Sequence, residues 1–162
     1  MNSEPKGSLT EEFSSIRAWR KNAGNYSRNG CHLELSIDAG ELLPAAALFL
    51  DKGFFLEDVT GVDVTEGILL IYHFDRYTTS ERVALRLIVP HESKVAPSIT
   101  SIHSGADWHE RECFDFYGVR FENHPNLKPL LLPDDLGYHP LLKEKGRKAL
   151  MSLLPLDQVV DS

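Results

Sequence analysis

The sequence has 162 residues, 42% of them hydrophobic and 25% charged, which are the proportions of one soluble globular domain and exclude a disordered or collagenous chain. The 24 Asp and Glu residues outnumber the 17 Lys and Arg residues, and the net charge of −7 excludes most nucleic-acid partners because it opposes contact with phosphates. The two cysteines are far apart and neither belongs to a CxxC pair, which excludes a disulfide framework or a cluster-binding spacing and favours a reducing compartment.

The predicted elements form a two-layer α+β domain, with helices packed on a mainly antiparallel or mixed sheet. In chain order they are a helix over 10–22, a strand over 31–37, a helix over 39–53, strands over 54–64, 67–74 and 81–89, and a helix over 105–117. Alternation in the strand over 81–89 gives the sheet one well-buried side, because four apolar residues share one face: Val83, Leu85, Leu87 and Val89.

The helix boundaries rest on capping residues and on spacing. Phe13, Ile16 and Trp19 stand at helical spacing in the helix over 10–22. The second helix is expected to begin with a capping box of Asp38 and Glu41 and to end at Gly53, with Pro44 in its first turn; the third begins near Ser104 and ends at Gly118.

Three parts of the chain are expected. They are a flexible N-terminus over 1–8, an α+β domain over 9–121 and an extended, proline-rich C-terminal interaction segment over 122–162, with residues 156–162 frayed. Because proline fixes φ and removes a backbone donor, the C-terminal segment is pre-organised and suited to lying across another subunit; the alternative is a strap over the domain's own core. No apolar run reaches the roughly 18–20 residues of a bilayer span, and no signal peptide is visible, so the chain is expected in the cytoplasm, meeting a membrane only through a partner.

The helix over 105–117 is predicted to have apolar side chains on two faces. On a helical wheel, the inner arc holds Ala106, Glu110, Cys113, Phe114 and Tyr117. The next arc is charged and holds Asp107, Arg111 and Asp115. The far side holds Trp108, Glu112 and Phe116. The second apolar stripe needs cover, which indicates a partner surface. The charged arc is interpreted as a solvated ladder of ion pairs, whereas Glu110 in the apolar arc must be hydrogen-bonded.

Catalytic and metal-binding interpretations of this helix are weaker. "HEREC" begins like a zincin motif but has Cys113 where the second histidine belongs, and Glu110 and Glu112 point to opposite sides of a helix, so they cannot act as an acid–base pair. His124 before Pro125 is interpreted as a turn histidine bonded to backbone. The chain also lacks the GxSxG, Walker and GxGxxG motifs.

Residues 110–135 closely resemble the signature of the thirty-kilodalton subunit of respiratory complex I, which is the C subunit of NADH:quinone oxidoreductase, and of related subunits in membrane-bound energy-conserving hydrogenases. The likeness extends over about residues 32–145. The candidate interface and signature residues, called the signature residues below, are Trp108, Glu110, Arg111, Glu112, Asp115, Phe116, Tyr117, Gly118, His124, Pro125, Lys128, Leu130 and Leu131.

This resemblance implies a non-catalytic peripheral-arm subunit of a multi-subunit oxidoreductase, without flavin, iron–sulfur cluster, metal or quinone of its own. The implied partners are the hydrogenase-like large subunit and the cluster-bearing small subunit, on the cytoplasmic face of a bacterial or archaeal inner membrane. The chain departs from the family near Leu136, where members often carry Trp, and at Leu142, where they carry Arg. Two alternatives stay open: the equivalent subunit of a nickel–iron hydrogenase or formate hydrogenlyase, and, more remotely, a free-standing hydrolase using Glu110 or His124.

Overall fold

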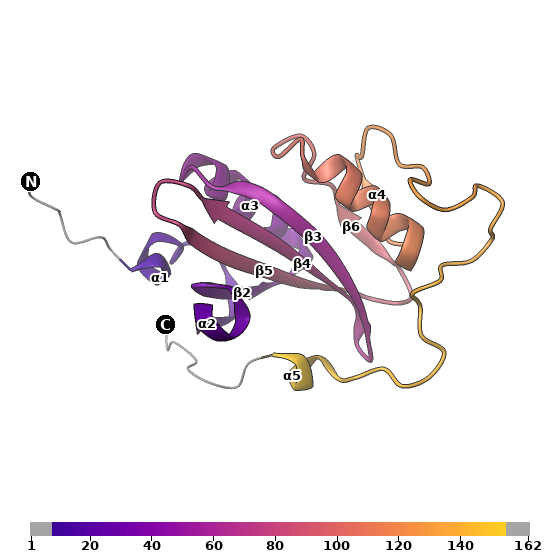
Figure 1. Cartoon of the computed structure of the whole chain (residues 1–162), viewed down its shortest axis with the longest axis horizontal. Coiled ribbons are helices and arrows are strands. Elements are labelled where there is room, and N and C mark those ends of the chain that lie inside the picture. Colours follow the sequence, from indigo (N-terminus) through magenta and orange to yellow (C-terminus); the bar gives the residue numbers. More distant parts are fainter. Residues whose placement is uncertain (1–7, 155–162) are drawn as a thin grey trace, which may run out of the picture.

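A computed structural model describes residues 8–154, and its centre is a five-stranded mixed sheet (Figure 1). In spatial order the strands are β1 Ala18–Ala23, β2 Leu33–Ile37, β5 Glu81–Val89, β4 Gly67–Arg76 and β3 Phe55–Val64. β2 and β5 are parallel and the other neighbours are antiparallel. The predicted α+β class with a mixed sheet is therefore confirmed.

The helices lie on both sides of this sheet. They are α1 Leu9–Glu12, α2 Tyr26–Asn29, the 3-10 turn η1 Ala39–Glu41, α3 Leu42–Asp51, α4 Ala106–Tyr117 and α5 Leu150–Leu153. In Figure 1, α3 lies behind the sheet, α4 lies at its upper right and α5 lies below it. Two short parallel strands, β6 Val95–Pro97 and β7 Arg120–Glu122, flank α4 in the chain and pair with each other.

The main core lies between the sheet and the helices α3 and α4. The side chains that β5 turns toward it are each at most 1% exposed, as the alternation predicted: Val83, Leu85, Leu87 and Val89. Burying a side chain of this size stabilises the fold by roughly 1.5–3 kcal/mol. On the other face of the sheet a smaller cluster joins Val64 and Leu69 to Leu150 and Leu154 from the C-terminal segment.

The predicted helix over 10–22 is wrong beyond its first turn. α1 is a single turn, and Ala18–Ala23 forms the edge strand β1, paired with β2. Phe13 and Ile16 are buried, but they lie in the turn between these elements, and Trp19 is half exposed. Backbone pairing with β2 satisfies the hydrogen bonds of this segment, and such pairing overrides a weak helical preference.

The other boundaries agree with the predictions to within a few residues. α3 has Pro44 in its first turn, and the chain leaves it through Gly53 at φ +76°. The predicted capping box is wrong, because Asp38 precedes η1 without a side-chain capping bond. α4 begins one residue later than predicted and ends at Gly118.

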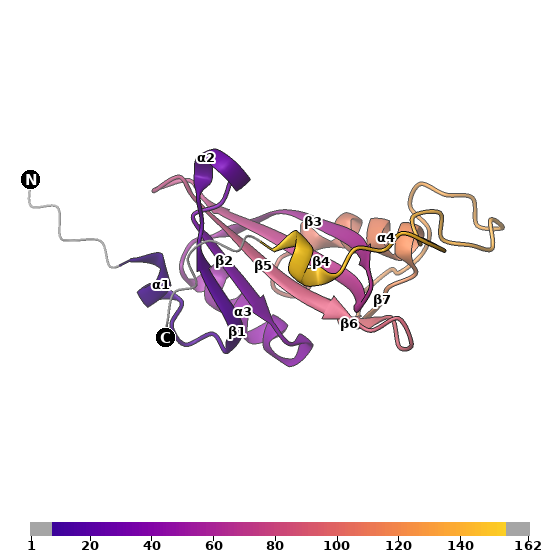
Figure 2. The same ribbon diagram turned by 90° about the horizontal axis from the view of Figure 1, so that it is seen from below.

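After β7 the chain runs out beyond α4 and returns beneath the sheet to α5 (Figures 1 and 2). Between β7 and α5 the described chain contains no helix, and its one ladder contact is a bridge between Val64 and Lys148. The predicted frayed ends over 1–8 and 156–162 lie outside the described residues, except for Ser8, which caps α1. Within residues 8–154, no helix is long and apolar enough to cross a membrane.

Candidate interaction site on helix α4

Two glycines let α4 pack closely on its surroundings. Gly118 takes the left-handed conformation at φ +74° that ends the helix, and a Cβ there would meet the His139 ring at 2.6 Å. A Cβ on Gly61 in β3 would lie 2.5 Å from the Tyr117 ring. The Tyr117 hydroxyl donates to the Gly61 carbonyl at 2.6 Å, so the end of α4 is fixed on the edge strand.

Glu110 is the buried carboxylate on the inner face of α4. It has no exposed surface, and it accepts hydrogen bonds from the Ser98 hydroxyl at 2.6 Å and the Ile99 backbone N–H at 2.8 Å. Burial raises the pKa of Glu110 to about 7; the two hydrogen bonds lower it, and the charge of Asp107 raises it further. The predicted hydrogen-bonded geometry is present, and it ties α4 to the loop after β6.

His124 joins the chain after β7 to the first turn of α4. Its Nδ1 accepts from the Asn126 backbone N–H at 3.0 Å, so the ring proton is on Nε2, which lies 3.1 Å from the Asp107 carbonyl oxygen. The same nitrogen is 3.3 Å from an Asp107 carboxylate oxygen and 3.9 Å from Glu110. The interpretation of His124 as a backbone-bonding turn histidine agrees with these contacts.

Asp115 and Arg111 hold the chain that follows, and the predicted ladder of solvated ion pairs is wrong. One carboxylate oxygen of Asp115 accepts three consecutive backbone N–H groups, from Leu130 and Leu131 at 2.8 Å and from Leu132 at 3.2 Å. The Arg111 guanidinium donates to the carbonyl oxygens of residues 128 and 129 at 3.1 and 2.9 Å. These bonds cross to another segment, which a wheel of α4 alone could not predict.

The same helix also fixes the far end of this segment, so that residues 128–139 form a closed loop, named the anchored loop here. The His139 Nδ1 lies 2.7 Å from the backbone oxygen of Asp115, and the Leu141 N–H donates to the backbone oxygen of Phe116 at 3.1 Å. Leu142 packs against the main core. These bonds attach the loop to the chain's own domain at both of its ends.

A second anchor, which the sequence reasoning missed, lies at the end of β3. The buried Asp63 carboxylate accepts from the Lys143 backbone N–H at 2.7 Å and from Arg147 Nε at 2.9 Å, and His91 Nε2 lies 2.7 Å away. Burial alone raises the pKa of Asp63, but these hydrogen bonds outweigh it and hold the pKa below its ordinary value. Strand alternation could have predicted that Asp63 is buried, because it places Asp63 on the same face of β3 as the inward-facing Val59.

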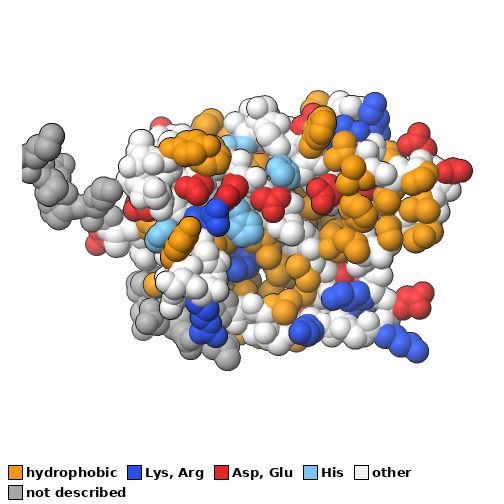
Figure 3. Space-filling model, viewed as in Figure 1, with side chains coloured by type: hydrophobic (Ala, Val, Ile, Leu, Met, Phe, Trp, Pro, Cys, Tyr) orange, Lys and Arg blue, Asp and Glu red, His pale blue; other side chains and the backbone are white. Residues whose placement is uncertain are grey.

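The outward side of this site is apolar. Trp108 is 67% exposed and Leu131 is 65% exposed, whereas Phe116 is half-buried beside Leu141. Figure 3 shows hydrophobic side chains gathered at the end of the molecule where α4 and the anchored loop lie, with acidic side chains along their edge. The remaining signature residues divide into the exposed Glu112, Pro125 and Lys128, and the partly buried Tyr117, Gly118 and Leu130.

The structure does not bring the candidate metal ligands together. His109 Nδ1 lies 3.1 Å from Asp58, whereas the Cys113 thiol lies 3.8 Å from the Val59 carbonyl. Burial raises the pKa of the Cys113 thiol to about 12, so it does not supply a thiolate. Within the described part of the chain, no group of three or more His, Cys, Asp or Glu side chains could hold a metal ion.

The sequence model of the family described as "Respiratory-chain NADH dehydrogenase, 30 Kd subunit" matches residues 35–149. Two relatives have related names. The C subunit of the F(420)H(2) dehydrogenase of Methanosarcina mazei is 42% identical over 89 residues, which are 53% of this chain and 56% of that protein. The C subunit of the NADH-quinone oxidoreductase of Roseiflexus sp. strain RS-1 is 38% identical over 93 residues, 56% of this chain and 53% of that protein.

Among solved structures, a chain of the membrane-bound sulfane sulfur reductase, an archaeal respiratory membrane complex, has the same fold. The TM-score is 0.71 at 22% identity, and the match covers 90% of this chain and 86% of that one. The match to the two curated relatives spans about half of their length. The family match contains Asp63, α4 and the whole anchored loop.

Proposed function

Because this chain belongs to the family of the 30 kDa subunit of respiratory-chain NADH dehydrogenase, we propose that it is a non-catalytic structural subunit in the peripheral arm of a proton-translocating NADH:quinone oxidoreductase. The observation that carries this proposal is how the polar signature residues are used. Glu110, Arg111 and Asp115 bond to the chain's own backbone, and so shape an outer apolar surface. In this role the chain is a scaffold for the quinone-reducing module.

A free-standing hydrolase has little support from the same geometry. A general acid or base must reach within hydrogen-bonding distance of its substrate. Neither Glu110 nor the side chain of His124 has any exposed surface, and both have partners within the chain. These contacts favour a structural role for both residues.

The proposed partners are the hydrogenase-like large subunit and the cluster-bearing small subunit of the same complex. Flavin, iron–sulfur clusters and quinone belong, on this proposal, to partner subunits and not to this chain. Residues 9–121 form the body of the subunit and residues 122–162 its interaction segment. The chain is peripheral, on the cytoplasmic face of the inner membrane, and meets the membrane through its partners. The exposed Trp108 and Leu131 support such contacts, because large apolar side chains are favoured at interface centres.

A second candidate is the equivalent subunit of another membrane-bound respiratory complex. The 42% identity to a subunit of the F(420)H(2) dehydrogenase supports this second candidate, since the name of that enzyme specifies a different electron donor. A nickel–iron hydrogenase or formate hydrogenlyase belongs to the same group of alternatives. The large subunit encoded beside this chain separates them, because a hydrogenase needs four nickel-binding cysteines there and a quinone enzyme lacks them.

Alanine at Arg111 tests the scaffold role in the intact complex. The substitution removes both bonds to residues 128 and 129, which are worth on the order of 1–3 kcal/mol when a charged donor is lost. We expect the assembled complex, measured on native gels, to fall roughly tenfold while turnover per assembled complex is unchanged. Arg120→Ala, at an exposed arginine on β7, is the matched control. Normal assembly with lost turnover would contradict the scaffold role.

A further inference from the structure

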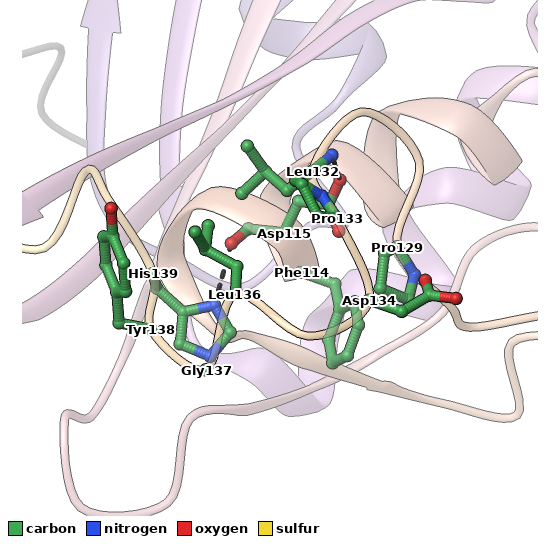
Figure 4. Close-up of a pocket in the computed structure, with 10 residues that line it drawn as sticks. All are labelled: Phe114, Asp115, Pro129, Leu132, Pro133, Asp134, Leu136, Gly137, Tyr138 and His139. Atoms are coloured by element: carbon green, nitrogen blue, oxygen red, sulfur yellow. Dashed lines mark hydrogen bonds between the residues drawn. The ribbon is translucent and has the colours of Figure 1, made fainter.

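A hollow lies between the anchored loop and α4 and is lined by residues of both (Figure 4). The volume is about 290 Å³, and the apolar walls include Phe114 from α4 and Leu132, Leu136 and Tyr138 from the loop. This volume is at the lower end of the roughly 300–1,000 Å³ of sites for small organic ligands, and it is large enough for one or two side chains.

The charged side chains at this hollow are acidic. Its lining includes Asp134, with Asp135 next to it in the chain, and both are exposed, whereas none of the ten lining residues is Lys or Arg. Asp115 also lines the hollow, but it is only 3% exposed, and one of its carboxylate oxygens already accepts three backbone N–H groups. The carboxylates available to an incoming group are therefore those at the rim.

The hollow does not need a ligand to hold its shape. Asp115 fixes the backbone over residues 130–132, of which Leu132 lines the hollow, and the bond between its backbone oxygen and His139 closes the other end. The prolines at 129 and 133 restrict the backbone further. A site that is formed in advance loses little conformational entropy on binding, which favours its use as a receptor.

We propose that this hollow is the docking site for a segment of a partner protein in the same complex, one that presents an apolar side chain next to a lysine or arginine. The apolar side chain fills the space between Phe114, Leu132 and Leu136, and the cation lies against Asp134 and Asp135. The inference rests on the proposed function, because it takes the occupant from the same respiratory complex. It deepens that function by specifying where one partner binds and with what chemistry.

Photo-crosslinking in the intact complex tests this directly. A benzophenone amino acid replaces Tyr138, which is 63% exposed at the hollow, or Tyr77, which is 84% exposed in the turn after β4 at the opposite end of the molecule (Figure 1). After irradiation of cells, we expect position 138 to crosslink to one peptide of another subunit, with Lys or Arg within a few residues of an apolar one. Position 77 should not reach that peptide.

Reversing the charge at the rim tests the cation. For the double substitution Asp134→Lys with Asp135→Lys, we expect at least about a fivefold lower yield of the crosslinked partner in a native purification, because rim charges control association. Asp51→Lys with Glu92→Lys, at two exposed positions outside residues 122–162, is the matched control and should leave the yield unchanged.

The outcomes distinguish this proposal from the function on which it rests. Suppose that the other subunits co-purify fully. If position 138 then crosslinks to no other subunit, or only to a second copy of this chain, or to a peptide without Lys or Arg, the proposed docking site is wrong and the scaffold role stands. An unchanged yield after charge reversal also overturns it. If purification of the unaltered chain recovers no respiratory subunit, the proposed function fails as well.

Discussion

At the scale of single residues, the buried Glu110 makes stability depend on pH in an unusual direction. Its pKa in the folded chain is about 7, above the ordinary 4.5, so the folded protein holds the proton more tightly than the unfolded chain does. The contribution to stability is therefore full below about pH 4.5 and is lost as pH rises toward 7. At 1.36 kcal/mol per unit of pKa, the loss is about 3 kcal/mol.

Glu110→Gln should remove this dependence. A glutamine resembles the protonated acid, and its amide can donate to the Ser98 oxygen while Ser98 bonds to Thr100, whose hydroxyl is 2.7 Å away. In urea unfolding at pH 5 and pH 8, we expect the wild-type chain to lose about 2.5 kcal/mol relative to the variant between the two pH values. Glu112→Gln, at an exposed residue of the same helix, should leave the pH dependence as in the wild type. A constant difference between wild type and Glu110→Gln would contradict this role.

At the scale of elements, Asp63 is the second anchor described above, and we expect it to hold the returning C-terminal segment in place. Asp63→Asn removes the charge that receives the Lys143 N–H and Arg147, at a cost of about 1–3 kcal/mol. We expect hydrogen exchange of the amides over 143–150 to become about tenfold faster, with a smaller change in β2 and β5. Glu144→Gln is the control in the same segment. Equal exchange over 143–150 in variant and wild type would show that Asp63 does not hold this segment.

The same anchor has a predicted pH dependence of the opposite sign to that of Glu110. Because the pKa of Asp63 lies below its ordinary value of 3.8 in the folded chain, its contribution is present above about pH 4 and is lost as the pH falls further. Exchange over 143–150 in the wild-type chain, corrected for its intrinsic pH dependence, should therefore accelerate below pH 4.

Local patterns predicted the elements whose burial follows a regular period, and little else. The alternation in β5 and the stop at Gly118 are both confirmed, because each depends on neighbours in the chain. The helix predicted over 10–22 was wrong, because β1 depends on pairing with a strand about 15 residues later. Asp115 and Asp63 accept hydrogen bonds from irregular backbone 15 and 80 residues away in the sequence, and such contacts leave no periodic signal in a sequence.

At the scale of the whole molecule, the site is a set of carboxylates directed inward and apolar groups directed outward. Glu110, Asp115 and Asp63 each hold backbone in place, whereas Trp108 and Leu131 remain exposed. The sequence predicted the two-faced helix, but not that its charged arc would shape the neighbouring loop. The combination is what a subunit needs when its interface must be rigid before the partner arrives.

The most direct test of the subunit role is native purification of the tagged full-length chain from its source organism, followed by mass spectrometry. We expect the hydrogenase-like large subunit and the cluster-bearing small subunit to be recovered with it in stoichiometric amounts. Recovery of a monodisperse monomer that binds no hydrophobic dye and brings no respiratory subunit with it would contradict the subunit role.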